Sequence, residues 1–179
     1  MQAQQVLAFW FDELEPKQHF VKSPSLDDTI RQRFGALHAA AARGELDAWR
    51  DDAPGRLAEI IVLDQFSRNL FRGDPRAFAN DTVALVLAQE MVRLKLDREL
   101  APARRAFAYM PYMHSESPRI HATAVELFSQ PGLEYNLKFE HAHKTIIDRF
   151  GRYPHRNAVL GRESTAEERA FLEQPGSSF

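Results

Sequence analysis

The chain has 179 residues, no cysteine and a formal net charge of −2, with 44% hydrophobic and 27% charged residues. These values are ordinary for a soluble globular protein, and we expect residues 1–179 to form a single domain. The charge argues against a nucleic-acid partner, and the missing cysteines exclude disulfides and thiolate metal sites. No signal peptide or long apolar run is present, which predicts a cytoplasmic protein without a membrane partner.

The first half of the chain is predicted to be helical. Helices are expected at about 4–12, from residue 25 or 27 up to Gly44, and over 56–69. The 56–69 helix is apolar nearly all round, which predicts a central, buried position. Asp64 and Arg68 lie four residues apart on it. A buried ion pair is the main interpretation, with a direct functional role as the alternative.

The second half is predicted to be helical as well, from cap and stop signals. Asp74-Pro75 is a helix start, Pro111 is expected to end a helix, and Ser164 to Glu167 reads as a capping box. The helices expected here are 75–96, 102–110, 118–129, 134–150 and a last one to about 172. About eight helices and no credible strand predict an all-α fold.

On a helical wheel of 134–150, four apolar side chains form one arc of about 100°. His143 falls at the centre of that arc, and His141 falls on the opposite side. We therefore expect His143 alone to point inward, either as a hydrogen-bonded core histidine or as a residue that lines a pocket. The apolar positions of the arc are Phe139, Ile146, Ile147 and Phe150.

His114 and Glu116 lie two residues apart just before a predicted helix. In an extended segment their side chains project the same way, so they could serve as acid and base. The alternative is that they cap the helix and brace the loop. A metal shared with His143 or His155 is weakly indicated because no ligand spacing of a known kind is present, so no metal and no cofactor is expected.

A third cluster follows the 134–150 helix. Guanidinium groups grip carboxylates and phosphates in a bidentate manner, so an anion pocket is the functional interpretation. The alternative is that the arginines pair with internal carboxylates, which is expected for any single arginine but not for all four. The cluster comprises Arg149, Arg152, His155, Arg156, Asn157 and Arg162.

Three long motifs carry a family resemblance. They are EIIVLDQFSRNLFRGDPRAFANDTVAL at 59–85, then YMPYMHSE, then HKTIIDRFGRYPHRNAVLGRESTAEERAFL. They resemble the bacterial domain-of-unknown-function family 924, over nearly the whole chain. The resemblance implies a tetratricopeptide-like α-α superhelix and no established activity. Ser67 and Tyr153 depart from the family pattern, which usually has proline and phenylalanine there. By motif match the resemblance points to Asp64, Arg68, Asn69, His114, Glu116, His143, Arg152, His155, Arg156 and Asn157.

Three functional hypotheses follow. The first is a pocket that binds an anionic small molecule or a peptide carboxylate. The second is an enzyme in which Glu116 with His114 or His143 transfers protons on an anionic substrate. The third is a purely structural polar network. The residues expected to bind a ligand are Asp64, Arg68, Asn69, Arg152, His155, Arg156 and Asn157.

Overall fold

The computed structural model describes residues 2–178, and within that range the chain forms helices and no strand. The predicted all-α class is confirmed. The single domain and the superhelical likeness stay predictions, and residues 1 and 179 lie outside the described range. The α-helices are α1 (Ala3–Ala8), α2 (Pro24–Ala42), α3 (Ala53–Ile61), α4 (Ser67–Leu70), α5 (Asp81–Arg93), α6 (Pro102–Met113), α7 (Pro118–Phe128), α8 (Glu134–Phe150) and α9 (Ala166–Leu172).

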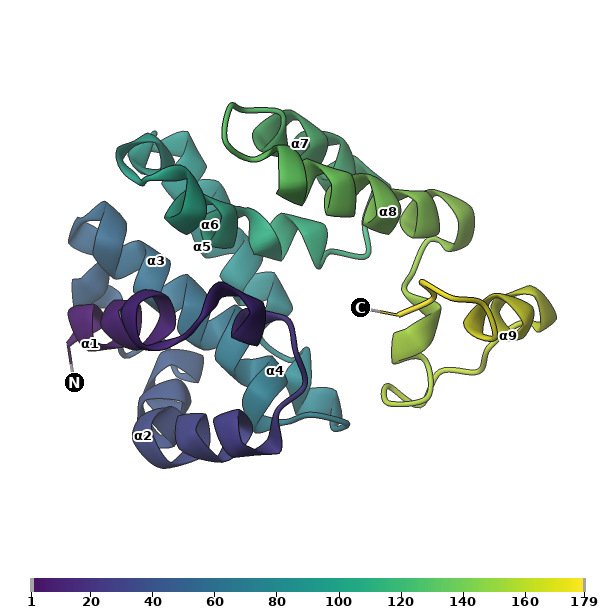
Figure 1. Cartoon of the computed structure of the whole chain (residues 1–179), viewed down its shortest axis with the longest axis horizontal. Coiled ribbons are helices and arrows are strands. Elements are labelled where there is room, and N and C mark those ends of the chain that lie inside the picture. The colour runs from purple at the N-terminus through teal and green to yellow at the C-terminus, as the bar shows by residue number, and fades with distance from the viewer. Residues whose placement is uncertain (1, 179) are drawn as a thin grey trace.

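Helix α3 organises the larger part of the molecule. It contacts α1, α5 and α6, while α2 packs against α4 (Figure 1). Helices α6, α7 and α8 follow one another as packed neighbours, with α7 and α8 along one edge of the molecule. Helix α9 stands apart at the end opposite α1, beyond the irregular segment 151–165.

The predicted helix at 56–69 is the buried centre of the fold. Ile60, Ile61, Val62 and Leu63 have no exposed surface, as the all-round apolar pattern predicts. The helical run is continuous from α3 to α4, but residues 62–66 form a π-helical turn. Such turns are rare in proteins overall, and those that occur are often found at functional sites. This one contains Asp64, the first residue of the DQFSRN motif.

The predicted helix 75–96 is interrupted. Asp74 caps the backbone N–H of Arg76 at 2.9 Å, but only a short 3₁₀ turn follows, over Pro75–Ala77. Helix α5 begins at Asp81 and ends at Arg93. The break lets the Phe78 ring pack under the guanidinium of Arg156, at 4.5 Å. Tertiary packing has overridden a good local start signal here.

The predicted stop at Pro111 is wrong. Helix α6 includes this proline and continues to Met113. A proline within a helix removes one backbone hydrogen bond, but Tyr112 and Met113 are buried in the core and their burial offsets that loss. The extra residues place His114 at the C-terminal end of α6.

Helix α8 has the predicted bounds and ends at Gly151, whose φ of 69° is the left-handed conformation expected of a C-terminal glycine cap. The capping box of the last helix lies one residue later than predicted. Thr165 is the cap, and its Oγ1 accepts a hydrogen bond from the backbone N–H of Glu168 at 3.1 Å. The long sequence 151–165 thus lies between two well-defined helix ends.

Candidate functional site

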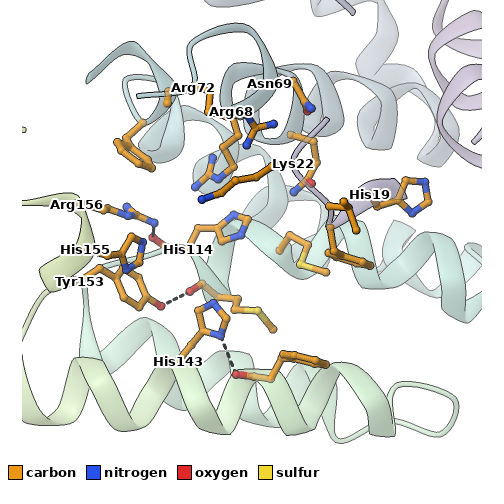
Figure 2. A pocket seen from close by; sticks show the side chains of 18 of the residues that line it. His19, Lys22, Arg68, Asn69, Arg72, His114, His143, Tyr153, His155 and Arg156 are labelled. Atoms are coloured by element: carbon orange, nitrogen blue, oxygen red, sulfur yellow. Dashed lines mark hydrogen bonds between the residues drawn. The ribbon is translucent and has the colours of Figure 1, made fainter. Parts of the chain in front are cut away.

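A cavity of about 450 Å³ lies where the three motifs meet. Its walls come from the linker 19–22, from α4 and the residues after it, from the end of α6, from α8 and from the turn 153–156 (Figure 2). Segments more than 130 residues apart in sequence therefore face one space. The predicted site residues that line it are Arg68, Asn69, His114, His143, His155 and Arg156.

Five residues beside this cavity form a closed circuit of hydrogen bonds, which we call the charged circuit. Two of them, Asp81 and the predicted ligand-binding residue Asp64, do not line the cavity themselves. His114 Nδ1 and Arg68 Nη1 lie 2.7 and 3.1 Å from the same Asp64 oxygen, Oδ1. Arg68 donates to both oxygens of Asp81 at 2.9 and 3.0 Å, and Arg156 Nη1 donates to Asp81 at 3.1 Å. Arg156 Nη2 donates to the carbonyl of His114 at 2.9 Å and closes the circuit. Two carboxylates balance two guanidinium groups.

Asp64 sets the state of His114. Burial favours the neutral carboxyl group, but the charge of Arg68 and the contact with His114 hold the pKa of Asp64 well below its usual range. The ionised carboxylate only accepts hydrogen bonds, so Nδ1 of His114 must carry the donated proton. Burial, and then the charge of Arg68, lower the pKa of His114 below its ordinary value. The imidazole is therefore neutral at pH 7, with Nε2 unprotonated.

His143 and His155 lie on other walls of the cavity, and both are kept neutral. His143 donates from Nδ1 to the carbonyl of Phe139 at 2.8 Å (Figure 2), and its ring packs edge-on to Tyr153. Burial lowers the pKa of His143 to about 3 and that of His155 to about 4. The prediction that His143 points inward while His141 is exposed is confirmed.

The structure does not bring Glu116 to the cavity. Its carboxylate accepts the backbone N–H of Tyr153 at 2.7 Å and both Nη groups of Arg162, at 2.6 and 2.8 Å. Burial would raise the pKa of Glu116, but the hydrogen bonds from Arg162 hold it below its usual value. Glu116 thus fixes the turn that carries His155 and Arg156, and His114 takes Asp64 as its partner instead.

Arg152 and Asn157 also lie outside the cavity lining. Arg152 forms a bidentate pair with Glu168 at 2.7 and 2.8 Å, and Asn157 donates to Ser164 at 3.0 Å. Asn157 also accepts from Arg162 at 3.0 Å. These contacts attach α9 and its approach to the 153–156 turn. Arg152 and Asn157 therefore support the structure around the site.

Every arginine of the third cluster has a carboxylate partner. Arg149 pairs with Glu167 and Arg152 with Glu168, while Arg156 pairs with Asp81 and Arg162 with Glu116. The expectation that internal pairing would not extend to all four is therefore wrong. The reason is that the folded chain supplies acids from α5, from the link between α6 and α7 and from α9, which no local pattern connects with this segment.

Lys22 and Asp81 are two residues of the site that sequence reasoning missed, as it also missed Arg72, which lines the cavity. Lys22 belongs to the exposed linker before α2, and its side chain reaches into the cavity toward Arg68 and His114 (Figure 2). Within residues 2–178 it has no carboxylate at ion-pair distance. Asp81 is the first residue of α5, where it resembles an ordinary helix-start acid. No sequence signal separates either residue from its surface neighbours.

A second buried histidine pair lies behind the cavity. His121 and Glu140 have no exposed side-chain surface, and His121 Nδ1 lies 2.6 Å from Glu140 Oε1. His121 Nε2 donates to the carbonyl of Ser115 at 2.8 Å. Burial raises the pKa of Glu140, and its contact with His121 joins α7 to α8. The His121–Glu140 pair is therefore part of the packing between these helices.

Two further observations concern the described residues, 2–178. No group of three or more histidine, aspartate or glutamate side chains there is arranged to hold a metal ion. No helix in the same range has the length and apolar character that are needed to span a bilayer.

Comparison with known proteins gives a family and a solved structure. Residues 6–176 match the family described as "Bacterial protein of unknown function (DUF924)". A solved structure, the protein of unknown function ATU0120 from Agrobacterium tumefaciens, is similar with a TM-score of 0.90 and 39% sequence identity. The similarity covers 96% of each chain. No curated protein matches this chain.

Proposed function

Since the chain belongs to the bacterial family of unknown function DUF924, we propose from its cavity that it binds an anionic small molecule with an apolar portion. The observation that carries this proposal is the charge of the lining. Four cationic side chains and no aspartate or glutamate occur among the described residues that line the cavity. The cations are Lys22, Arg68, Arg72 and Arg156.

These cations differ in what they offer a ligand. Arg68 and Arg156 share Asp81, and Arg72 is held by Asp27 at 2.7 Å, so all three are fixed in place before a ligand arrives. Groups that are fixed in advance lose little conformational entropy on binding. Lys22 adds a positive charge that no described carboxylate balances. A carboxylate or phosphate in the cavity would supply that balance.

The mouth of the cavity is apolar. Phe20 and Val21 of the linker, and Tyr135 and Phe139 of α8, line it and are among the exposed large hydrophobic side chains of the molecule. Exposed apolar groups gathered at one opening are typical of a binding site. A ligand with an apolar chain would cover them, at about 0.8 kcal/mol for each buried methylene group. We therefore expect affinity for a carboxylate to increase with chain length.

The alternative functions explain fewer of the observed features. A purely structural network accounts for Glu116, Arg152 and Asn157, whose partners are all internal, but it gives no reason for the cavity or for Lys22. A peptide carboxylate would use the same cations and would extend past the apolar mouth. The cytoplasmic location expected from the sequence remains part of the proposal.

The test compares four six-carbon compounds by thermal shift and calorimetry at low salt. Hexanoate and hexyl phosphate are expected to stabilise the protein, whereas hexanol and hexylamine are not. Lys22→Ala should weaken hexanoate binding about tenfold, which corresponds to about 1.4 kcal/mol. The matched control is Lys17→Ala, since Lys17 is an exposed lysine of the 3₁₀ turn just before this linker and does not line the cavity. Equal binding of hexanol and hexanoate, or equal loss in both variants, would contradict the proposal.

A further inference from the structure

The arrangement of Asp64 and His114 exceeds what anion binding needs. A binding site for an anion is served by cations, yet the residue at the centre of the charged circuit is a neutral imidazole. Its Nδ1–H is held by a buried carboxylate, and the other edge of its ring faces the cavity (Figure 2). A histidine oriented by a carboxylate in this way has one nitrogen available as a proton acceptor.

The surroundings keep that nitrogen in its basic form. The charged groups around His114 are Asp64 and Arg68 at the α3–α4 junction, Asp81 of α5 and Arg156 of the 153–156 turn. Their charges cancel, so a second proton on His114 would give the circuit a net positive charge beside Lys22. The basic form therefore persists at neutral pH, and an approaching ligand meets an unprotonated Nε2.

The rest of the lining narrows the class of reaction. Among the described lining residues there is no serine, threonine or cysteine to act as a nucleophile and no carboxylic acid to serve as a separate proton donor. Removal of a proton from a carbon atom, followed by return of a proton to the same atom, is a reaction that needs only one base. The cations around the base would stabilise the anion that forms when the proton leaves.

We propose that this cavity catalyses proton exchange at the carbon beside the oxo group of a bound 2-oxo carboxylic acid, with His114 Nε2 as the general base. Asp64 acts as the positioning residue. This inference rests on the proposed function, because the carboxylate must first be held by Lys22 and the arginines. A 2-oxo acid with an aliphatic chain supplies an anionic end for these cations and an apolar end for the mouth.

The step balances without another reactant. The C3–H bond breaks and an Nε2–H bond forms, while the C–H electron pair becomes the C2–C3 double bond. The oxo oxygen takes the negative charge as an enolate, next to Lys22 and Arg68. The Nε2–H then exchanges its proton with water, and return of a proton from Nε2 to C3 restores the 2-oxo acid with its C3 hydrogen exchanged.

The experiment incubates the protein with 2-oxohexanoate in D₂O and follows the loss of the C3 proton signals by NMR. Calorimetry with the same compound measures binding separately. We expect exchange to exceed the buffer rate at least about 100-fold, the usual contribution of a positioned base. His114→Gln should return exchange to the buffer rate while it still binds 2-oxohexanoate within about threefold. His141→Gln is the control, because His141 is exposed on the outer side of α8.

The outcomes separate this inference from the proposed function. Binding of 2-oxohexanoate with exchange at the buffer rate overturns the catalytic role and leaves the binding proposal standing. Unchanged exchange in His114→Gln also overturns it. Failure to bind either hexanoate or 2-oxohexanoate removes both proposals.

Asp64→Asn tests the positioning role through the pH profile. The Asp64 charge favours the protonated form of His114, so its removal should move the midpoint of the exchange profile to lower pH and lower the plateau. A purely structural role for Asp64 would lower the amount of folded protein and leave the midpoint unchanged. That result would overturn its assignment as a positioning residue.

Discussion

Asp81 is the residue on which the geometry of the cations depends, because it holds Arg68 and Arg156 at once. The Asp81→Asn variant keeps the shape of the side chain and removes its charge. We expect the free energy of unfolding to fall by about 3 kcal/mol, as when one partner of a largely buried ion pair is lost. Urea unfolding measures this loss.

Asp28→Asn is the matched control for this prediction. Asp28 pairs with Arg31 on the surface, with more than half of both side chains exposed, so the free energy of unfolding should change little. If Asp81→Asn were equally harmless, the charged circuit would not be the support that its contacts indicate.

At the same scale, the residue types were easier to predict than their roles. The Asp64–Arg68 ion pair expected from the four-residue spacing is present at 3.1 Å. The sequence placed Glu116 beside His114, whereas the fold places Asp64 there. A spacing of two residues says where side chains point only if the backbone is extended, and His114 instead ends a helix.

At the scale of elements, the end of α8 determines where the 153–156 turn begins. Gly151 has φ +69°, and a Cβ added to it would meet no atom within 4 Å. Gly151→Ala should therefore cost only the conformational penalty, about 1–2 kcal/mol in the free energy of unfolding. The same variant should weaken hexanoate binding, because the turn carries His155 and Arg156.

Gly35→Ala is the control and should have the opposite sign. Gly35 lies inside α2, outside the left-handed region, and a Cβ added there would also meet no atom within 4 Å. Alanine at this position should stabilise the protein by about 0.5–1 kcal/mol. Urea unfolding of both variants distinguishes a glycine whose left-handed conformation disfavours alanine from one in an ordinary helix. Equal changes in the free energy of unfolding of Gly151→Ala and Gly35→Ala would contradict this prediction.

Elements were predictable where their ends carry side-chain signals. Both ends of α8 and the start of α7 agree with the sequence. The errors at Pro111 and at residues 75–96 have one cause. Local stop and start signals are worth a few kcal/mol. The burial of Tyr112 and Met113, and the packing of the partly exposed Phe78 ring against Arg156, outweigh them.

At the scale of the whole molecule, neutral buried histidines predict a loss of stability in mild acid. His143 and His155 have pKa values of about 3 and about 4 in the folded chain, against about 6.5 when unfolded. Between pH 6.5 and 4 the unfolded chain binds more protons, so the free energy of unfolding decreases as the pH falls. Above pH 6.5 this contribution is complete.

Urea unfolding at pH 7, 6, 5 and 4 measures that decrease. His143→Gln should reduce the pH 7 to pH 5 difference by about 1–2 kcal/mol, because one histidine contributes at most about 1.4 kcal/mol per pH unit. His141→Gln should leave the difference unchanged, since that ring is exposed. An unaltered pH dependence in His143→Gln would show that the ring is not held neutral by its burial.

The sequence by itself determined the all-α class, the buried central helix, the inward face of α8 and six of the residues that line the cavity. Those features rest on periodicity and on cap residues, which act within a few positions along the chain. Only the tertiary structure decided that Asp64 orients His114, that Asp81 joins two arginines and that Lys22 completes the cationic wall. Partners of a buried charge are chosen by proximity in space, which sequence spacing does not encode.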